Sequence, residues 1–378
     1  MGSLISFPRY ILGRQYPQEY GQEASEISLP ELSGYPTSVP FEIGEVRISR
    51  ICVFPIKSCR GTSLAEARYT PESLEHDRRW GIIDATTHRI LTARQVEKMV
   101  LIAPRILPDP ASPHGGTLEV SFPEESGCES FAVPLNPTPD LLSSWEVIDD
   151  GSVNGYARVD GYICQAASTD LPSPSVILSR YFDRPVHLMM KGPEPRACPT
   201  ISAFPALEAS TLYQDAFPLH VASEESLAEF ECVLRRLTAD QDTAIGGLDR
   251  ERWTKSSSVL IDRFRPNVII KGAGVPFAED FWREVTISPS SESSDERHPA
   301  EVTFVMKCTR CLLPNVDPDL GVRDAAVPFK ILMKFRTGMY QEGKNKPCFG
   351  TYGIFGDSGV LKVGDIVSVK EWTDANGV

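Results

Sequence analysis

The sequence predicts a β-rich α+β fold with two barrel-like halves. Of its 378 residues, 31 are Pro and 27 are Gly, which favours short elements joined by turns over a bundle of long helices. Most apolar segments are short and end at turn residues, as strands do, whereas one segment has clear helical spacing. We expect a mobile N-terminal extension over residues 1–44, a first domain over 45–190 and a second domain over 191–372.

The first strand is predicted near Val46. Apolar and polar residues alternate from Val46 to Ile48, and the alternation resumes out of phase at Ile51. A slip of this kind indicates a β-bulge, and Pro55 ends the strand. Other strands are predicted at 80–83 and 90–92, which would form a hairpin around the turn 84–88, at 267–270, at 301–308 and through Val367 and Val369, with a polar loop over 288–301.

One helix is predicted from residue 223. Apolar residues recur at helical spacing from Leu227 to Leu237. Ser223 can cap the first turn through its hydroxyl, and the acidic residues Glu224 and Glu225 interact favourably with the N-terminus of a helix.

The net charge restricts the ligands of the chain. Asp and Glu number 51 against 38 Lys and Arg, a net charge of −13. We expect no general nucleic-acid binding, because it needs many Lys and Arg, and an anionic ligand would need a local cationic cluster. No apolar run reaches the roughly 18 residues of a membrane span, and no secretory signal is recognisable. We expect no transmembrane segment, reduced thiols and, by default, a monomer.

The most distinctive chemical motif is Cys308-Thr309-Arg310-Cys311. Motifs typical of nucleotide hydrolysis, Rossmann hydride transfer and α/β-hydrolases do not occur. Two thiols at this spacing suit part of a zinc site, a redox dithiol, one thiolate on a metal held mainly by a cofactor, or two buried structural cysteines. The other cysteines and the six His offer no second zinc pair, and the residues after Cys311 do not resemble a redox turn. A zinc site is therefore only weakly supported and a redox dithiol is not favoured, although neither is ruled out; the last two interpretations remain open.

Basic residues gather at predicted strand ends. Several lie beside small hydroxyl or amide residues, which could bond to the edge of a heterocycle. Arg supplies paired donors and Lys a point charge, so such a set suits a ligand with a phosphate group. Each residue alone also fits an ordinary surface ion pair. The set comprises Lys57, Ser58, Arg78, Arg79, Thr92, Arg94, Gln95, Arg263, Arg265, Asn267 and Thr309.

Together, these segments resemble a known family. The β-barrel domain that precedes a MOSC domain is similar to ICVFPIKSCRG, DRRWGIID and LTARQ, and the MOSC domain is similar to RFRPNVII, VMKCTRCLLPNVDPDLG and GDSGVLKVGDIVSV. Order and spacing match over roughly residues 45–370. Such domains occur in molybdenum cofactor sulfurases and in the mitochondrial amidoxime-reducing component. Because the sequence has no aminotransferase-like region, the resemblance favours the amidoxime-reducing type.

The resemblance implies a molybdenum cofactor, a molybdopterin dithiolene with a terminal phosphate, between the two domains. In this family one protein thiolate completes the coordination of the metal, and the resemblance assigns this role to Cys311 rather than Cys308. A thiolate suits a metal that is already bound by sulfur. The other implied cofactor contacts are Lys57, Ser58, Arg78, Ser223, Arg265, Asn267, Thr309 and Arg310, with Arg94 and Gln95 as further candidates.

The implied activity is the reduction of N-hydroxylated compounds such as amidoximes, hydroxylamines and N-oxides. The sequence has no flavin or haem motif, so electrons are expected from partners, for which the family suggests cytochrome b5 and NADH-dependent cytochrome b5 reductase. The alternative is a module that carries molybdenum cofactor or persulfide sulfur without turnover. Vertebrate relatives begin with an apolar membrane anchor that is not recognisable here, so we expect a cytoplasmic or mitochondrion-associated protein.

Overall fold

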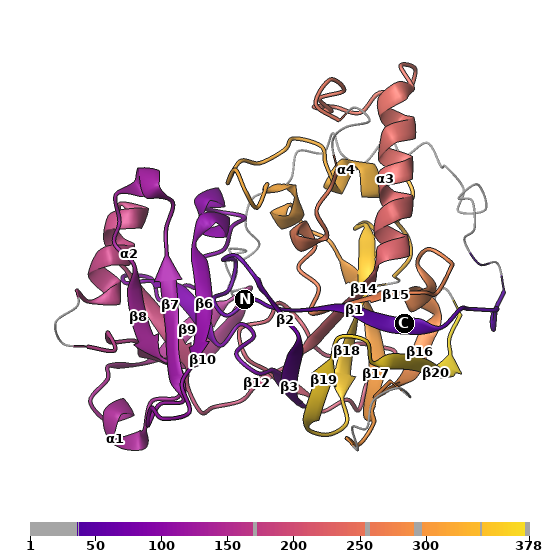
Figure 1. The fold of residues 1–378 in the computed structure, drawn as a ribbon. Coiled ribbons are helices and arrows are strands. Elements are labelled where there is room, and N and C mark those ends of the chain that lie inside the picture. Colours follow the sequence, from indigo (N-terminus) through magenta and orange to yellow (C-terminus); the bar gives the residue numbers. More distant parts are fainter. Residues whose placement is uncertain are drawn as a thin grey trace, which may run out of the picture.

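The computed structural model describes residues 36, 38–168, 172–253, 258–290, 297–340 and 342–374. Two β-rich halves lie side by side, with the long helix α3 (Glu224–Ala239) on the second (Figure 1). Most of the predicted extension over residues 1–44 lies outside the described residues. At its end, Phe41 and Ile43 pack against the core of the second half.

The second half is a closed β-barrel. Among the described residues, seven strands pair in a ring, all antiparallel except β14 and β15. We call this the barrel half. The strands in order around the ring are β1 (Val46–Val53), β15 (Val268–Lys271), β14 (Leu219–Ser223), β18 (Cys348–Phe355), β17 (Ala300–Thr309), β16 (Trp282–Ser288) and β20 (Ile366–Trp372), and β2 (Thr62–Leu64) pairs with β1.

Strand β1 belongs to this barrel although it comes first in the chain. It pairs with β15 on one side and β20 on the other, and Figure 1 draws it in indigo among orange and yellow strands. The predicted bulge is confirmed, because the register with β15 shifts between Ile48 and Arg50. Alternate residues of β1 face different cores: Ile51 packs inside the barrel, whereas Cys52 packs under α3.

The first half consists of two open sheets. Among the described strands they curl but do not close, so the predicted first barrel is only a half-barrel. We call this part, residues 80–191, the sheet half. One sheet is β5 (Trp80–Asp84), β11 (Val186–Lys191), β10 (Tyr156–Ile163) and β9 (Val147–Val153); the other is β6 (Ala103–Pro108), β7 (Gly116–Ser121) and β8 (Phe131–Pro134), and α2 (Pro174–Phe182) packs on β8 and β11.

The predicted hairpin over residues 80–92 is correct only in its first strand and turn. Strand β5 forms, but its main partner is β11, about a hundred residues later in the chain. Residues 90–92 form no strand; Ile90 makes a single bridge to Ile83. The partner of β5 is decided by packing of the whole sheet half, which local alternation does not reveal.

The remaining predicted elements of the barrel half are confirmed. Helix α3 begins at Glu224, and the Ser223 hydroxyl caps it by accepting the Ser226 N–H at 3.1 Å. The segments predicted at 267–270, 301–308 and through Val367 are strands β15, β17 and β20. The loop between Ser288 and Ala300 is also present, although residues 291–296 lie outside the described part.

Short elements connect the two halves and cover their ends. The strands are β3 (Glu66–Thr70), β4 (Ser73–Leu74) and β19 (Gly359–Lys362), which form one small sheet, and the pair β12 (Arg196–Ala197) and β13 (Ser210–Thr211). The short helices are α1 (Pro139–Leu142), α4 (Phe329–Met333) and the 3-10 turns η3 (Glu97–Leu101), η4 (Glu124–Ser126), η5 (Ile261–Arg263), η6 (Ala278–Phe281) and η7 (Leu313–Asn315).

Candidate functional site

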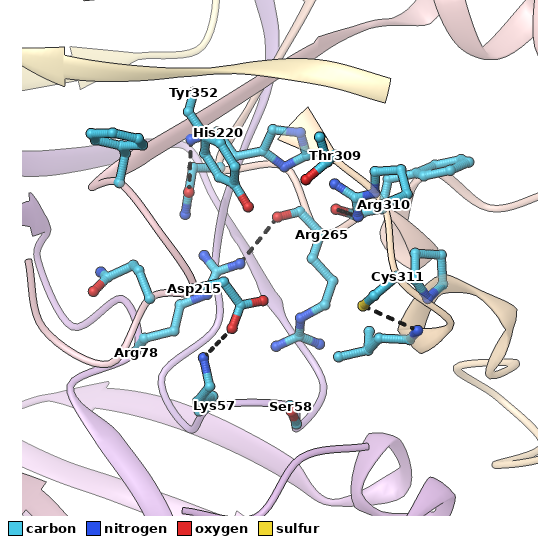
Figure 2. A pocket seen from close by; sticks show the side chains of 16 residues that line it. Lys57, Ser58, Arg78, Asp215, His220, Arg265, Thr309, Arg310, Cys311 and Tyr352 are labelled. Carbon is cyan, nitrogen blue, oxygen red and sulfur yellow. Dashed lines mark hydrogen bonds and ion pairs between the residues drawn. The ribbon is translucent and has the colours of Figure 1, made fainter. Parts of the chain in front are cut away.

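A cleft opens between the connection that follows β1 and one end of the barrel. Its space is about 610 Å³, its open mouth included. The connection contributes Lys57, Ser58 and Arg78, and the barrel half contributes the segments before β14 and β15 and after β17 (Figure 2). The sequence-predicted residues that line it are Lys57, Ser58, Arg78, Arg265, Asn267, Thr309, Arg310 and Cys311.

Three of the lining residues have a left-handed backbone. The φ angles are 68° at Ser58, 46° at Arg78 and 58° at Arg265. For residues other than Gly this conformation costs of order 1 kcal/mol each. Such strain persists only where surrounding contacts hold it, and it concentrates at functional sites.

Lys57 is buried and is held by two acceptors. Its ammonium group donates to the Tyr213 carbonyl at 2.7 Å and to Asp215 Oδ1 at 2.5 Å. Burial lowers the pKa of Lys57, and the Asp215 carboxylate opposes that shift. For Asp215 itself, burial favours the neutral form, but the adjacent Lys57 holds its pKa well below the usual range. Each group thus stabilises the charged form of the other.

Arg94 does not line the cleft. Its guanidinium donates to Asn154 Oδ1 at 2.5 Å, and the Asn154 amide in turn donates to Asp215 Oδ1. Asn154 lies in the turn between β9 and β10. Arg94 is thus connected to the cleft by hydrogen bonds, through Asn154 to the lining residue Asp215. Gln95 is also outside the cleft, and its side chain accepts from the N–H and hydroxyl of Thr92.

Arg78 and Arg265 stack on one aromatic ring. Their guanidinium carbons lie 4.4 Å and 4.1 Å from the centre of the Phe54 ring. The Nη1 atom of Arg78 donates to both oxygens of the buried Asp77 at 2.7 Å, and its Nη2 atom donates to the Arg265 carbonyl at 3.1 Å. These contacts fix the two cations side by side at the cleft wall.

One guanidinium nitrogen of Arg265 has no hydrogen-bond partner among the described residues. Its Nη1 atom donates to the Cys59 carbonyl at 2.7 Å, whereas its buried Nη2 atom has no partner among the described residues. Burial, and secondarily Arg78, lower the pKa of Arg265 to about 9. A buried, unpaired guanidinium nitrogen is costly unless an acceptor meets it. The site therefore fits an anionic ligand at this position.

The two thiols of the CTRC motif differ in their surroundings. Cys308 is buried, burial raises its pKa, and the Arg310 Nη1 atom donates to its sulfur at 2.6 Å. Cys311 is partly exposed, lines the cleft, and accepts the Leu313 N–H on its sulfur at 3.5 Å (Figure 2). The described residues contain no group of three or more His, Cys, Asp or Glu suited to a metal. Cys311 is thus a single accessible thiol rather than one corner of an all-protein zinc site.

Two predicted contacts have structural roles instead. The Asn267 amide lines the cleft, but it is taken up by the barrel: its oxygen accepts the His220 N–H and its nitrogen donates to the Cys52 carbonyl, both at 3.2 Å. Ser223 does not line the cleft. Its hydroxyl accepts the Ser226 N–H and donates to Glu279 at 2.9 Å. Both bonds belong to the helix cap and its neighbour, so the hydroxyl does not contact a ligand in the cleft.

Several residues of the cleft gave no signal in the sequence. His220 is buried, and burial together with Arg310 lowers its pKa to about 3, so the ring is neutral. Burial and the nearby Cys308 raise the pKa of Tyr352, so its hydroxyl keeps its proton. Their positions on β14 and β18 follow from barrel closure. The residues missed are Gln214, Asp215, Phe217, His220, Phe264, Leu313, Pro314 and Tyr352.

The charges that line the cleft are mainly positive. Lys57, Arg78, Arg265 and Arg310 face a single lining carboxylate, Asp215. In a chain with a net charge of −13, this concentration of cations is local and specific. The arrangement can bind a polyanion such as a phosphate ester and present it to one thiol.

Within the described residues, no helix has both the length and the apolar character that a membrane crossing requires.

Comparisons with known proteins agree with this architecture. Residues 45–165 match the MOSC N-terminal beta barrel domain, and residues 208–368 match the MOSC domain. Mitochondrial amidoxime-reducing component 1 of Mus musculus is 30% identical over 332 residues, which cover 85% of this chain and 81% of that protein. The Homo sapiens component 1 is 28% identical over 329 residues, with 85% and 82% covered, and the Rattus norvegicus component 2 is 27% identical over 333 residues, with the same shares.

Solved structures also match. One of them, the solution structure of a Bordetella bronchiseptica protein, is 13% identical, covers 33% of this chain and 88% of that one, and gives a TM-score of 0.23. A score this low supports no conclusion about the fold.

Proposed function

Because this chain belongs to the family in which a MOSC N-terminal beta barrel domain precedes a MOSC domain, we propose that it is a molybdenum-dependent reductase of N-hydroxylated compounds. Its relatives include amidoxime-reducing components at 25–30% identity. The single observation that best supports the proposal is the cleft itself. It places one accessible thiol, Cys311, beside a set of cations that no other charge in the cleft fully balances.

The residues present fit a molybdopterin cofactor. The unpaired Arg265 Nη2 atom and the nearby Arg78 and Lys57 suit a terminal phosphate, and Arg supplies paired donors for it. Cys311 suits a metal that already has sulfur ligands. When bound, the cofactor would supply the two-electron redox chemistry that cleaves an N–O bond.

The protein would supply position and electrostatics around that chemistry. Asp215 opposes the loss of charge that burial favours at Lys57, and Asp77 fixes Arg78. Arg310 donates to Cys308 and to the Phe264 carbonyl at 2.7 Å, which orients the turn that presents Cys311. Tyr352 keeps its proton, and its hydroxyl forms a hydrogen bond with Cys308.

Electrons would come from a partner protein. By relation to the amidoxime-reducing components, we propose cytochrome b5 and its NADH-dependent reductase as donors. The compartment, cytoplasmic or mitochondrion-associated, stays a prediction.

The proposal is tested by turnover of an amidoxime with cytochrome b5, its reductase and NADH, using protein purified from a host that makes the cofactor. Cys311→Ser should abolish reduction while the circular dichroism spectrum is unchanged. Cys232→Ser, on the exposed face of α3, is the matched control and should keep full activity. Cys308→Ser should cost less than Cys311→Ser. Full activity in Cys311→Ser would refute the assignment. Cofactor that is retained and passed to an apo-enzyme without any turnover would favour the carrier alternative.

A further inference from the structure

The turn between β9 and β10 brings the sheet half to the edge of the cleft. Tyr156 pairs with Val153, so Asn154 and Gly155 form a two-residue hairpin connection. Both have a left-handed backbone, with φ angles of 48° and 88°. An Asn-Gly pair is the usual choice for such a turn, because Asn tolerates positive φ better than most residues and Gly adopts it freely. The turn presents the Asn154 side chain to Asp215.

Arg94 decides which way the Asn154 amide faces. Its guanidinium group can only donate hydrogen bonds, and it donates to Asn154 Oδ1 at 2.5 Å. The amide nitrogen then faces Asp215 Oδ1 and donates to it. With the opposite orientation, an NH₂ group would face the guanidinium and an oxygen would face the carboxylate, so both bonds would be lost. We call this pair, Arg94 and Asn154, the latch.

The same carboxylate oxygen also holds Lys57. The ammonium group of Lys57 donates to Asp215 Oδ1 at 2.5 Å (Figure 2), and it donates to the Tyr213 carbonyl at 2.7 Å. An ammonium group has three N–H donors, and these two acceptors use two of them. Because Lys57 lines the cleft, its third N–H is available to a ligand there.

The direction of that third N–H depends on the latch. The rotation of the ammonium group is set by its two acceptors, of which the Tyr213 carbonyl belongs to the backbone and Asp215 is a side chain. Among the described residues, the side-chain donors to Asp215 are Lys57 and Asn154. Without Asn154, the carboxylate would be held only by the flexible lysine that it is meant to orient. A preorganised donor binds an anion with a smaller loss of conformational entropy.

We propose that Asn154 is a positioning residue for anion binding in the cleft, oriented by Arg94, and that the sheet half contributes to the site through this latch. The inference rests on the proposed function, in which the anion is the phosphate group of the cofactor. It assigns a role to two side chains that do not line the cleft.

The test measures the Kd of inorganic phosphate for the full chain, made in a host that lacks the cofactor, by isothermal titration calorimetry. Asn154→Gly removes the amide and keeps the turn, because Gly adopts positive φ. Arg94→Ala removes the group that orients the amide, and a double variant combines the two changes. Asn136→Ala is the matched control, since Asn136 accepts the guanidinium of Arg79 at 2.6 Å in the sheet half, outside the cleft.

Asn154→Gly should raise the Kd of phosphate about three- to tenfold, the range for one hydrogen bond. Arg94→Ala should raise it by a similar factor. The double variant should bind phosphate as Asn154→Gly does, because Arg94 acts through the amide and the two effects do not add.

Two further measurements separate positioning from stability. The dissociation of pterin from the cofactor-loaded protein should accelerate in Asn154→Gly by the same factor as the Kd rises. The melting temperature of this variant should stay within about 3 °C of the wild type. Asn136→Ala should change neither the Kd nor the rate of pterin dissociation.

Three results would overturn the proposal. An unchanged Kd in Asn154→Gly, with or without a lower melting temperature, would leave Asn154 a purely structural role. Effects of Arg94→Ala and Asn154→Gly that add in the double variant would mean that Arg94 acts by its charge alone. A wild-type protein that binds no phosphate would refute the latch together with the anion site.

Failure of the proposed function is a different result. If phosphate binding depends on Asn154 as expected but the molybdenum-loaded protein reduces no amidoxime, the reductase proposal fails and the latch stands. If amidoximes are reduced but Asn154→Gly binds phosphate and retains pterin like the wild type, only the latch fails.

Discussion

Asp215 is the residue on which the charge of Lys57 depends. Burial lowers the pKa of the lysine, and the carboxylate opposes the shift. In Asp215→Asn that opposition disappears, so Lys57 should lose its proton at a lower pH than in the wild type. Pterin should then dissociate about threefold to tenfold faster at pH 9 than from the wild type, with a smaller difference at pH 6.5. The rate of pterin dissociation at each pH is measured during dialysis, by the fluorescence of the released pterin.

The control for this prediction is Asp242→Asn, an exposed carboxylate beyond the end of α3. It should release pterin at the wild-type rate at both pH values. Equal release from Asp215→Asn and the wild type at pH 9 would show that Lys57 does not need its partner.

For single residues, the sequence predicts the cations and thiols of the cleft better than the residues that hold them in place. Arg78, Arg265 and Cys311 follow strands or precede them, so their positions at one edge could be inferred. Asp215 lies in an ordinary loop, and its role arises only because the folded chain brings Lys57 and Asn154 against it. Ser223 was correctly predicted as a helix cap, and that role uses the hydroxyl that a ligand contact would need.

At the scale of elements, the start of α3 is joined to η6 by a buried acid. Glu279 accepts the Ser226 hydroxyl at 2.8 Å and the Ser223 hydroxyl at 2.9 Å. Burial, and secondarily Asp280, raise the pKa of Glu279 to about 7. The junction therefore holds a carboxylic acid that is neutral in mildly acidic solution.

This raised pKa makes stability depend on pH. The folded protein keeps the Glu279 proton up to about pH 7, whereas the unfolded chain loses it near its usual value of 4.5. Stability from this group is thus full below pH 4.5 and is lost as pH rises to about 7. Relative to wild type, Glu279→Gln should gain about 2–3 kcal/mol in free energy of unfolding between pH 5 and pH 7.5. Urea denaturation at the two pH values measures the difference.

The exposed Glu224, in the same turn of α3, provides the control. Glu224→Gln should follow the wild type at both pH values. A constant offset between Glu279→Gln and the wild type, independent of pH, would mean that Glu279 is ionised in the folded protein.

Sequence patterns located most of the elements of the barrel half but not their partners. The alternation from Val46 predicted a bulged strand, and β1 has that bulge. Nothing local indicated that β1 pairs with β15 and β20, which lie more than two hundred residues later. Pairing over such distances is decided by which apolar faces close one core, and only the folded chain determines that.

At the scale of the whole molecule, the segment before β1 anchors the barrel. The Phe41 ring lies 4.7 Å from the Trp372 ring and 5.5 Å from the Phe281 ring. Deletion of residues 1–40 keeps these contacts, so the free energy of unfolding and the cofactor content should be unchanged. Phe41→Ala removes them and should cost about 2 kcal/mol, since Phe41 is only partly buried. Thermal and urea unfolding compare the two proteins.

Loss of cofactor after deletion of residues 1–40 would contradict the expectation that this stretch contributes no packed core. No effect of Phe41→Ala would show that the aromatic contact is not part of the stable barrel.

The cleft lies between the connection that follows β1 and one end of the barrel, and the central claim is that it binds a molybdenum cofactor. The most direct test is the molybdenum and pterin content of the protein purified from a host that makes the cofactor. The account predicts close to one molybdenum and one pterin per chain, with molybdenum lost from Cys311→Ser. Zinc or no metal in place of molybdenum, with no pterin, would contradict it.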